Sequence, residues 1–438
     1  MALISTYLHL TVFNAIGKGI GAIIPLLILI LFGVSNDLDL FLYAYGLILY
    51  LVNIVTPSIE TAVVPHLIET RFKELDLKQH LSRLSTAGIL IVLGIFVALS
   101  LSLDFLLPEL GFFSHTEVDE VKDYLYPFTL FLALAVWNSF LTGILNSISL
   151  FKLASVSIIA RNLTTMLLML LGTQFGFGIE TLITAYTVGE IIRTIVLSTS
   201  IPEPGLRPRP TTRGYFSDNA IKEIGISLFF QVAGSAFLGV NLIVDRSMAK
   251  LVDTEGSISI LFYADRIYSL GFFVLFAGLL PILTTIVSKK HFDEHKGDAG
   301  KLFTELTSMA RIIGLIALFL TIAALSMSDL AEYLVFLTGQ VDKESTELLI
   351  VTLQLMVVGL APQIMSSIYS RGLIILKNTR LILVVGIIIV FLNASGNYFF
   401  IGLIGLPGIA LSTTISHTVC ALLFYVGFRS LMIHPPQA

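Results

Sequence analysis

The sequence predicts an all-α polytopic membrane protein with about twelve transmembrane helices in two six-helix lobes. Of its 438 residues, 55% are hydrophobic and only 13% are charged, whereas soluble domains carry roughly 25% charged residues. A soluble protein of this length needs more polar side chains on its surface than the chain contains. Twelve helices of about 22 residues would cross a ~30 Å hydrocarbon layer and leave only short loops. The composition therefore excludes a large soluble domain, a coiled coil and a disordered regulator.

Hydrophobic runs separated by turn and charge clusters place the twelve spans. The predicted ranges are 10–33, 41–65, 84–106, 123–148, 154–174, 178–199, 222–249, 256–287, 305–327, 346–373, 380–400 and 406–428. Residues 201–221, rich in proline and arginine, form the longest polar break near the middle. We therefore expect an N-terminal lobe over 1–200, a cytoplasmic linker over 201–221 and a C-terminal lobe over 222–438. Six spans in each lobe predict a parallel repeat.

Basic residues crowd the predicted loops on one side of the membrane. They recur there from Arg71 to Arg429, whereas the loops on the other side are acidic and hold Lys122, Lys250 and Lys343. Because cytoplasmic loops carry the excess of positive charge, both termini are predicted to be cytoplasmic.

Several kinds of chemistry have no sequence signature in this chain. It lacks a Gly-x-x-x-x-Gly-Lys-Ser/Thr loop for nucleotide phosphates,. Cys420 is the single cysteine, so neither an intrachain disulfide nor a cysteine metal cluster can form,. We therefore expect neither an enzyme nor a protein with a metal, an organic cofactor or a nucleic-acid partner.

Charged residues inside the predicted spans are the most informative candidates for function. A charge at mid-bilayer costs about 2.5–3.5 kcal/mol, so a retained one faces a cavity, a partner or an interface. Arg266 lies well inside its span beside Asp265, and Asp245 and Arg246 form a similar pair. These pairs predict either ion pairs that fix the bundle or a cationic cavity for an anionic substrate, because the arginine fork suits phosphate.

Other charges within spans are candidates for the same cavity or for ion coupling. Lys18 lies between two glycines that permit close helix approach, and Arg161 lies within the fifth span,. Arg371 lies near a predicted cytoplasmic end. Arg193 and Arg311 also lie near such ends and are expected to reach the lipid headgroups. The acidic candidates, which either balance the basic groups or carry a coupling cation, are Asp39, Glu60, Glu190 and Asp245.

Several short motifs, spread over nearly the whole chain, carry a resemblance to a known family. The most specific motif is Phe262-Tyr263-Ala264-Asp265-Arg266, preceded by Val244-Asp245-Arg246 and Gly256-Ser257-Ile258-Ser259 and followed by Leu280-Pro281. Other segments are Tyr369-Ser370-Arg371 with Lys377-Asn378-Thr379, Phe32-Gly33 with Asp39, and Val64-Pro65 with Glu69. Together these segments resemble the MurJ/MviN flippases of the multidrug/oligosaccharidyl-lipid/polysaccharide (MOP) exporter superfamily.

This resemblance implies a V-shaped exporter fold with a central cationic cavity, in the inner membrane of a bacterium. The implied cargo is a polyprenyl-pyrophosphate-linked glycan that moves from the inner to the outer leaflet. Arg266 would lie at the cavity wall and Asp265 would orient it. Further substrate contacts would come from Lys18, Arg161, Arg246 and Arg371. The implied partners are membrane lipids and glycan polymerases or synthases.

Some features of the chain depart from the peptidoglycan-precursor flippases, which usually carry two further C-terminal helices and several arginines in the first two. Here Lys18 is the only basic residue of the first span, and Asn53 lies where an arginine is expected. The cargo is therefore either lipid II or another lipid-linked oligosaccharide. A sodium or proton gradient or the membrane potential would drive transport, because ~100 mV is worth about 2.3 kcal/mol per charge.

Two other functions stay open at this point. A cation-coupled drug exporter of the same superfamily needs an acidic, aromatic-lined cavity, whereas the charges within these spans are more basic than acidic. A non-transporting scaffold for glycan-assembly enzymes needs interaction surfaces but no cavity arginines.

Overall fold

The computed structural model describes most of the chain between residues 19 and 433. The described residues are 19–21, 23–72, 114–148, 150–202, 232, 240–276, 298–336, 339, 341–376 and 378–433, with positions 81–83, 85–86, 88–90, 93–94 and 97. Their regular structure is helical, and no strand occurs among them. The predicted all-α fold class is confirmed.

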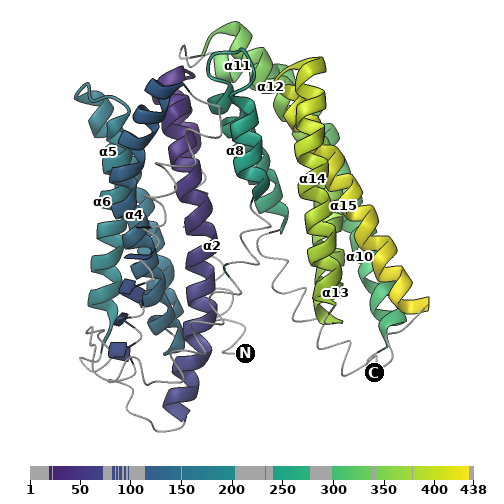
Figure 1. Cartoon of the computed structure of the whole chain (residues 1–438), viewed down its shortest axis with the longest axis horizontal. Coiled ribbons are helices and arrows are strands. Elements are labelled where there is room, and N and C mark those ends of the chain that lie inside the picture. The colour runs from purple at the N-terminus through teal and green to yellow at the C-terminus, as the bar shows by residue number, and fades with distance from the viewer. Residues whose placement is uncertain are drawn as a thin grey trace. The chain divides into compact units, whose positions relative to one another are not determined.

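The described helices follow one another along the chain (Figure 1). They are α2 (Asn36–Phe72), α4 (His115–Ser147), α5 (Phe151–Gln174), α6 (Glu180–Ser200), α8 (Ser257–Phe276), α10 (Ala299–Ser326), α11 (Ser328–Phe336), α12 (Lys343–Val358), α13 (Leu360–Ile375), α14 (Thr379–Ile404) and α15 (Pro407–Ile433). In this part of the chain, eight helical segments are long and apolar enough to cross a membrane, and each matches a predicted span. The predicted spans 84–106 and 222–249 lie largely outside the described residues.

The chain divides into two compact units. The first comprises Met1–Phe32 and Asn36–Ile243, and the second comprises Gly33–Ser35 and Val244–Ala438. The predicted linker at 201–221 lies mostly outside the described residues, so the predicted lobe boundaries stay a prediction.

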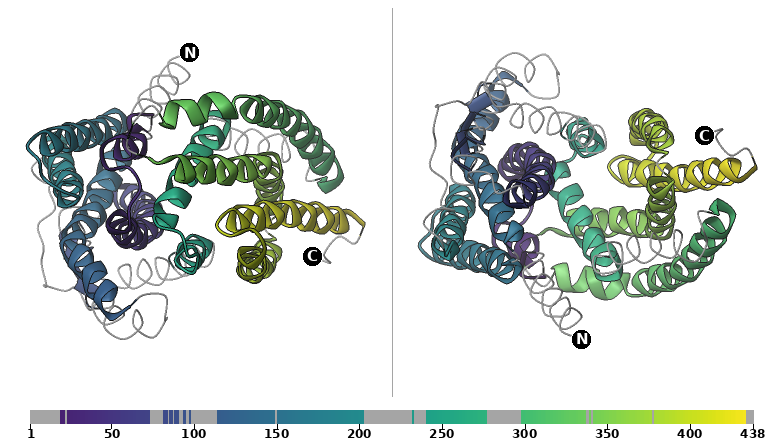
Figure 2. Two further views of the ribbon diagram at one scale, coloured as in Figure 1. Left: turned by 90° about the horizontal axis from the view of Figure 1, so that it is seen from above. Right: turned by 90° about the horizontal axis from the view of Figure 1, so that it is seen from below.

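Aromatic side chains fill the core of the first unit. In this unit α2 packs on α4, α4 on α6 and α5 on α6, and α5 and α6 lie side by side (Figure 2). The Tyr45 ring of α2 stacks on the Tyr186 ring of α6 with centroids 4.7 Å apart. Phe128 of α4 contacts both Tyr45 and Phe41. Offset and edge-on ring contacts of this kind add to the burial of apolar area.

The second unit packs around α13 and α15. α15 contacts α12, α13 and α14, while α10 packs on α13 and α8 on α12. Near the start of α10 and the end of α15, the Phe303 ring meets the Phe428 ring edge-on at 5.2 Å. The Tyr369 ring of α13 contacts Tyr425 at 5.6 Å. Rings from three helices thus close this end of the core.

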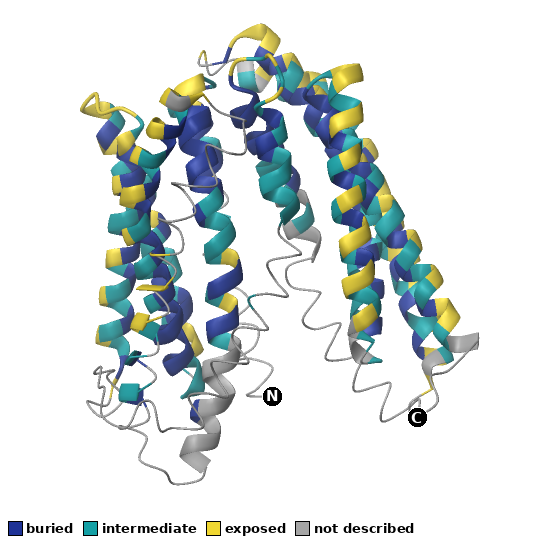
Figure 3. Cartoon of the chain, viewed as in Figure 1, coloured by how far each residue is buried: buried dark blue, intermediate teal, exposed yellow. Residues whose placement is uncertain are grey.

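Two helices of the second unit expose most of their apolar side chains. α10 and α14 each bury only 22% of their most apolar stretch (Figure 3). Leu315 and Phe319 on α10 and Phe391 on α14 are among the large exposed side chains. Apolar surface of this extent is not left in water by soluble proteins. These faces therefore contact lipid.

The tenth predicted span is divided into α12 and α13 at Gly359. Pro362 lacks the N–H that would bond the carbonyl four residues earlier, and its ring crowds that carbonyl. A Cβ at Gly359 would lie 2.7 Å from the Thr414 hydroxyl, which donates to the Leu355 carbonyl at 2.6 Å. A proline and a closely packed glycine therefore account for a break that hydropathy did not predict.

The acidic loop expected between the ninth and tenth spans contains a further helix, α11. The next helix, α12, begins after Asp342, whose carboxylate accepts the N–H of Ser345 at 2.9 Å. This backbone N–H holds the pKa of the Asp342 carboxyl below its ordinary value, because it stabilises the charged form. The cap satisfies one of the free N–H groups at the start of the helix.

Gly189 brings α6 close to α5 in the first unit. A Cβ at Gly189 would lie 3.0 Å from the carbonyl oxygen of Arg161 and would also meet the Thr165 hydroxyl. The close approach places Glu190, the next residue, beside Arg161. At Gly402 on α14, by contrast, no described atom lies within 4 Å of the corresponding Cβ.

We predict opposite effects of alanine at these two glycines. Gly189→Ala should lower the unfolding free energy of the detergent-solubilised chain by about 1–3 kcal/mol, because the added methyl forces α5 and α6 apart. Gly402→Ala should raise it by about 0.5–1 kcal/mol, since alanine favours a helix and meets open space. Thermal unfolding followed by circular dichroism measures both. Shifts of the same sign would contradict the packing described.

Candidate functional site

Two arginines of the second unit lie against the same aromatic ring. The guanidinium carbon of Arg266 on α8 lies 5.2 Å from the centroid of the Phe262 ring. That of Arg246 lies 5.3 Å from the same centroid. Phe262 and Arg266 are four residues apart on α8 and therefore share a face. Cation–π attraction holds both guanidinium groups against the ring, so Phe262 keeps two positive charges close together.

The two arginines differ in their access to a ligand. Arg246 is buried, whereas 28% of the Arg266 side-chain surface is exposed. The Asp265 carboxylate lies 3.9 Å from Nε of Arg266. That contact is long and leaves the two terminal nitrogens of Arg266 outside it. Arg266 is therefore the member of the pair that a ligand can reach.

Asp245 belongs to a second cluster, which it forms with residues of α14 and α15. Nδ2 of Asn397 donates to Oδ1 of Asp245 at 2.6 Å, and the Thr413 hydroxyl lies 3.5 Å from Oδ2. Nδ2 of Asn393 donates to the Thr413 hydroxyl at 3.3 Å. Three segments thus bring one carboxylate, one hydroxyl and two amides together. We call these four residues the Asp245 cluster.

Two amide oxygens of the Asp245 cluster are buried without a hydrogen bond in the described part of the chain. They are Oδ1 of Asn393 and Oδ1 of Asn397. Leaving such a group unsatisfied costs about 1–3 kcal/mol each. Carboxylate, amide and hydroxyl oxygens are the ligands that hard cations take. The oxygen atoms of this cluster are therefore of the kind that a hard cation takes as ligands.

Two arginines of the first unit form a network with Glu190. This α6 carboxylate is fully buried, and its Oε1 lies 2.9 Å from Nη1 of Arg161 on α5. Its Oε2 lies 3.7 Å from Nη1 of Arg193 and accepts Nδ2 of Asn138 at 2.6 Å. Two guanidinium groups and an amide therefore surround one carboxylate.

The position of Arg193 corrects one expectation. Its side chain is buried and does not reach the headgroups, because Glu190 lies one turn earlier and the Thr142 hydroxyl lies 3.4 Å away. Residues three apart on a helix share a face, so the carboxylate draws the guanidinium inward. Glu60 on α2 lies near this network, where it accepts the Ser139 hydroxyl of α4 at 3.3 Å.

Three further residues were predicted as site residues: Asp39, Arg371 and Lys18. Asp39 is buried in the first turn of α2, far along that helix from Glu60. Arg371 is on α13, and among the described residues its Nε is buried without a hydrogen bond. Lys18 lies outside the described residues. The roles assigned to Asp39, Arg371 and Lys18 stay predictions.

Five of these site residues were not predicted from the sequence: Phe262, Asn138, Asn393, Asn397 and Thr413. A signal existed for two of them. Asn393 and Asn397 are four residues apart in a strongly apolar run, and paired polar side chains on one face of a membrane helix are rare. Phe262 carried no comparable signal, because phenylalanine within a span is ordinarily a packing residue.

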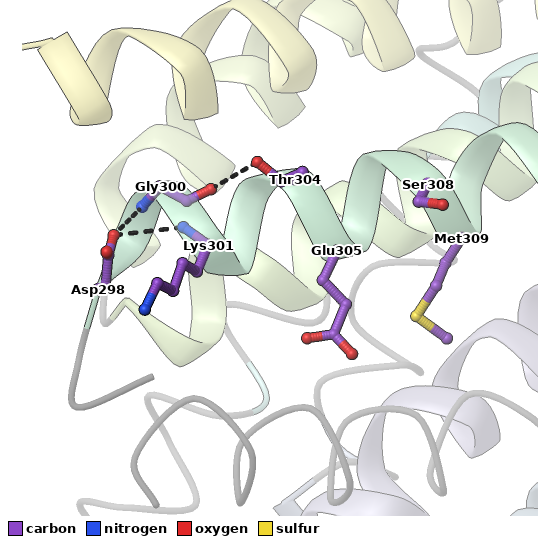
Figure 4. A pocket seen from close by; sticks show the side chains of 7 residues that line it. All are labelled: Asp298, Gly300, Lys301, Thr304, Glu305, Ser308 and Met309. Atoms are coloured by element: carbon purple, nitrogen blue, oxygen red, sulfur yellow. Dashed lines mark hydrogen bonds between the residues drawn. The ribbon is translucent and has the colours of Figure 1, made fainter. Parts of the chain in front are cut away.

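A cavity of about 700 Å³ beside the start of α10 contains none of the predicted site residues (Figure 4). Its lining residues are Asp298, Gly300, Lys301, Thr304, Glu305, Ser308 and Met309. The Asp298 carboxylate accepts the N–H groups of Gly300 at 2.8 Å and Lys301 at 3.2 Å. It is thus an N-cap, and the helix terminus is already occupied by the chain's own carboxylate.

Comparison with known proteins identifies the family of this chain. A family model described as "Lipid II flippase MurJ" matches residues 28–437. The chain belongs to this family. The resemblance predicted from the Asp265-Arg266 motif and its neighbours is therefore confirmed, and a flippase family is one of transporters rather than enzymes.

A relative of known family agrees with this assignment. The lipid II flippase MurJ of Burkholderia cenocepacia is 22% identical over 323 residues, which cover 72% of this chain and 60% of that protein. The chain thus aligns with about three-fifths of this relative's length.

Solved structures show the fold. A lipid II flippase MurJ in an inward closed conformation has a TM-score of 0.78 and 20% identity, covering 97% of this chain and 90% of the other. An inward-facing multidrug resistance MATE family transporter of the MOP superfamily has a TM-score of 0.79 and 14% identity, covering 97% and 96%. A MOP superfamily transporter from Pyrococcus furiosus has a TM-score of 0.70 and 14% identity, covering 99% and 96%. The chain therefore has the fold of these exporters.

We predict that neutralising Glu190 destabilises the chain far more than neutralising an exposed acid. Glu190→Gln removes the carboxylate between Arg161 and Arg193 and should cost about 3–5 kcal/mol of unfolding free energy. Glu347→Gln is the matched control, because Glu347 pairs with Lys343 at 3.6 Å on the exposed surface and should cost less than ~1 kcal/mol. Thermal unfolding in detergent measures both.

The double variant Glu190→Gln/Arg193→Met should recover part of the loss, because it also removes one buried positive charge. If it is no more stable than Glu190→Gln alone, the network does not balance charge as described.

Proposed function

We propose that this protein is a flippase that moves a polyprenyl-pyrophosphate-linked glycan from the inner to the outer leaflet. The cargo class is a lipid II-type peptidoglycan precursor or a related lipid-linked oligosaccharide. Membership of the MurJ family supports this proposal. The observation that carries it is the pair of guanidinium groups held on Phe262, because two adjacent positive charges in a membrane span favour an anionic ligand.

The arginine pair suggests how the headgroup is bound. The terminal nitrogens of Arg266 donate two parallel hydrogen bonds to phosphate oxygens, a geometry that lysine cannot offer. Arg246 adds a second positive charge against the same ring, and Asp265 orients Arg266. The prenyl chain stays in the lipid. Transport proceeds by alternating access, in which one unit moves against the other.

The Asp245 cluster is proposed as the site of the coupling cation. Its carboxylate supplies one negative charge, and the amide oxygens of Asn393 and Asn397 supply ligands that are otherwise unsatisfied. A sodium ion or a proton neutralises the carboxylate. Asp245 and Arg246 are consecutive residues, so the cation and the headgroup act on the same short segment.

The cellular setting follows from the same reasoning. The protein is a multi-pass membrane protein, and we place it in the bacterial inner membrane with both termini in the cytoplasm. The excess of lysine and arginine in the predicted inner loops supports this orientation,. Association with glycan polymerases or synthases would remove the product outside the membrane and so favour net export.

We predict that Arg266 is needed for lipid export. The assay uses liposomes that contain the purified chain and lipid II or a simpler polyprenyl-pyrophosphate sugar. Arg266→Ala should slow the appearance of the lipid in the opposite leaflet by at least about tenfold, which corresponds to ~1.4 kcal/mol of activation free energy. Arg266→Lys should be intermediate, because it keeps the charge but loses the fork. Arg311→Ala, at an exposed arginine of α10, is the matched control and should flip normally.

Wild-type rates in Arg266→Ala would overturn the arginine-pair mechanism. If neither lipid moves under an imposed ion gradient while a cationic dye is exported, the protein is instead a drug exporter, a function borne by the MATE transporter with the same fold.

We predict that Asp245 makes export respond to a cation. Binding of sodium to the folded chain should raise the melting temperature of the wild type, whereas Asp245→Asn should abolish the rise together with the response of flipping to a sodium gradient. Asp329→Asn, at an exposed acid of α11, should keep both. If sodium is inert but a proton gradient drives flipping that Asp245→Asn abolishes, the cation is a proton. Indifference to both cations would refute the coupling site.

A further inference from the structure

An apolar groove lies in the second unit, and neither arginine of the pair lines it. It encloses about 510 Å³ and is lined by Met248, Leu251, Tyr398, Phe399, Ile401, Gly402 and Leu403. One wall comes from the end of helical residues 240–249 and the turn after them, and the other wall from the last turns of α14. None of the lining residues is charged, so the groove does not suit the anionic headgroup or a cation.

The two walls are tied together next to the groove. Met248 lies one turn after Asp245, and Ile401 lies one turn after Asn397, so each pair shares a helix face. The hydrogen bond of 2.6 Å from Asn397 to Asp245 therefore fixes the spacing of the walls one turn away. The groove exists in the protein before any ligand arrives, and this lowers the ordering cost of binding.

The groove continues the lipid-facing surface of α14. Tyr398 is 78% exposed, and Phe399 and Leu403 are also exposed, on a helix whose most apolar stretch is mostly unburied. Tyrosine near the end of a membrane helix is typical of the boundary between headgroups and hydrocarbon. Gly402 adds no side chain and leaves the α14 backbone open to a ligand, since no described atom lies within 4 Å of its missing Cβ.

We propose that this groove binds one acyl chain of a membrane phospholipid at the end of α14. Hydrocarbon is the chemistry that surrounds α14, and the groove offers it more van der Waals contact than the convex face of a helix does. The inference rests on the groove and on membrane insertion, and it stands or falls independently of the proposed cargo.

The test is photo-crosslinking of the full chain in phosphatidylethanolamine/phosphatidylglycerol vesicles that contain a phospholipid with a diazirine on its acyl chain. Mass spectrometry then locates the labelled peptides. We expect the groove residues of α14 to be labelled at least about threefold more than exposed residues near the other end of α14. Even labelling along the exposed face of α14 would overturn the proposal.

A pair of phenylalanine variants separates the groove from the general lipid surface. Gly402→Phe adds a ring at a groove position where a Cβ meets no described atom within 4 Å, and should reduce the excess labelling to the level of the rest of α14. Val384→Phe, at an exposed position near the start of α14, adds the same ring elsewhere and should leave the labelling unchanged. Unaltered labelling in Gly402→Phe would overturn the proposal.

Further outcomes identify other occupants. If Gly402→Phe does not fold, Leu403→Ala removes one wall side chain and should halve the excess, whereas no decrease would count against the groove. Displacement of the labelled phospholipid by an equimolar polyprenyl phosphate would assign the groove to a prenyl chain and overturn the phospholipid proposal. Absence of lipid adducts from the groove residues, while the rest of the exposed face of α14 is labelled, would overturn the proposal.

Discussion

The free-energy cost of a charge in hydrocarbon governs where the polar side chains of this protein lie. Each ionised group in a span is stable only if another group of the protein or a ligand compensates it. Three kinds of compensation occur in this chain. Glu190 is surrounded by guanidinium groups, Arg246 and Arg266 lie against an aromatic ring, and Asp245 is bound by amides and a hydroxyl.

The two units compensate their buried charges in different ways, and the difference indicates different roles for the two units. In the first unit, the Glu190 network brings three helices together and its carboxylate is fully buried. In the second unit, Arg266 stays partly exposed, and the Asp245 cluster keeps two amide oxygens unsatisfied. The first arrangement favours a rigid support, whereas the second is where we propose that an anion and a cation bind. Because Asp245 and Arg246 adjoin, a cation bound at Asp245, as proposed, would alter the surroundings of Arg246.

Composition and hydropathy were sufficient to predict the fold class and the eight membrane helices seen in the described residues. Local motifs were sufficient to select Asp265-Arg266 and Asp245-Arg246, because charges within spans are rare enough to carry information. The partners of those charges come from distant segments, and no periodicity connects Asp245 with Asn397, 152 residues later. Arg193 was placed at the headgroups from its position along the helix alone. Glu190, three residues earlier on the same face of α6, was a local signal,, but its burial against Arg161 of α5 and Asn138 of α4 depends on the packing of distant segments. Pro362 is a local cause of the break at Gly359. The break was not predicted because the hydropathy of the chain stays high across it.

The most direct test of this view compares the affinity of the purified chain for three lipids with the same prenyl chain: a pyrophosphate, a monophosphate and the uncharged alcohol. If the guanidinium groups at Phe262 bind the headgroup, the wild type should bind the pyrophosphate most tightly and the alcohol most weakly. Arg266→Ala should remove most of that difference while leaving the affinity for the alcohol unchanged. Equal affinities of the wild type for all three lipids would show that the prenyl chain alone determines binding, and would contradict a cationic headgroup site.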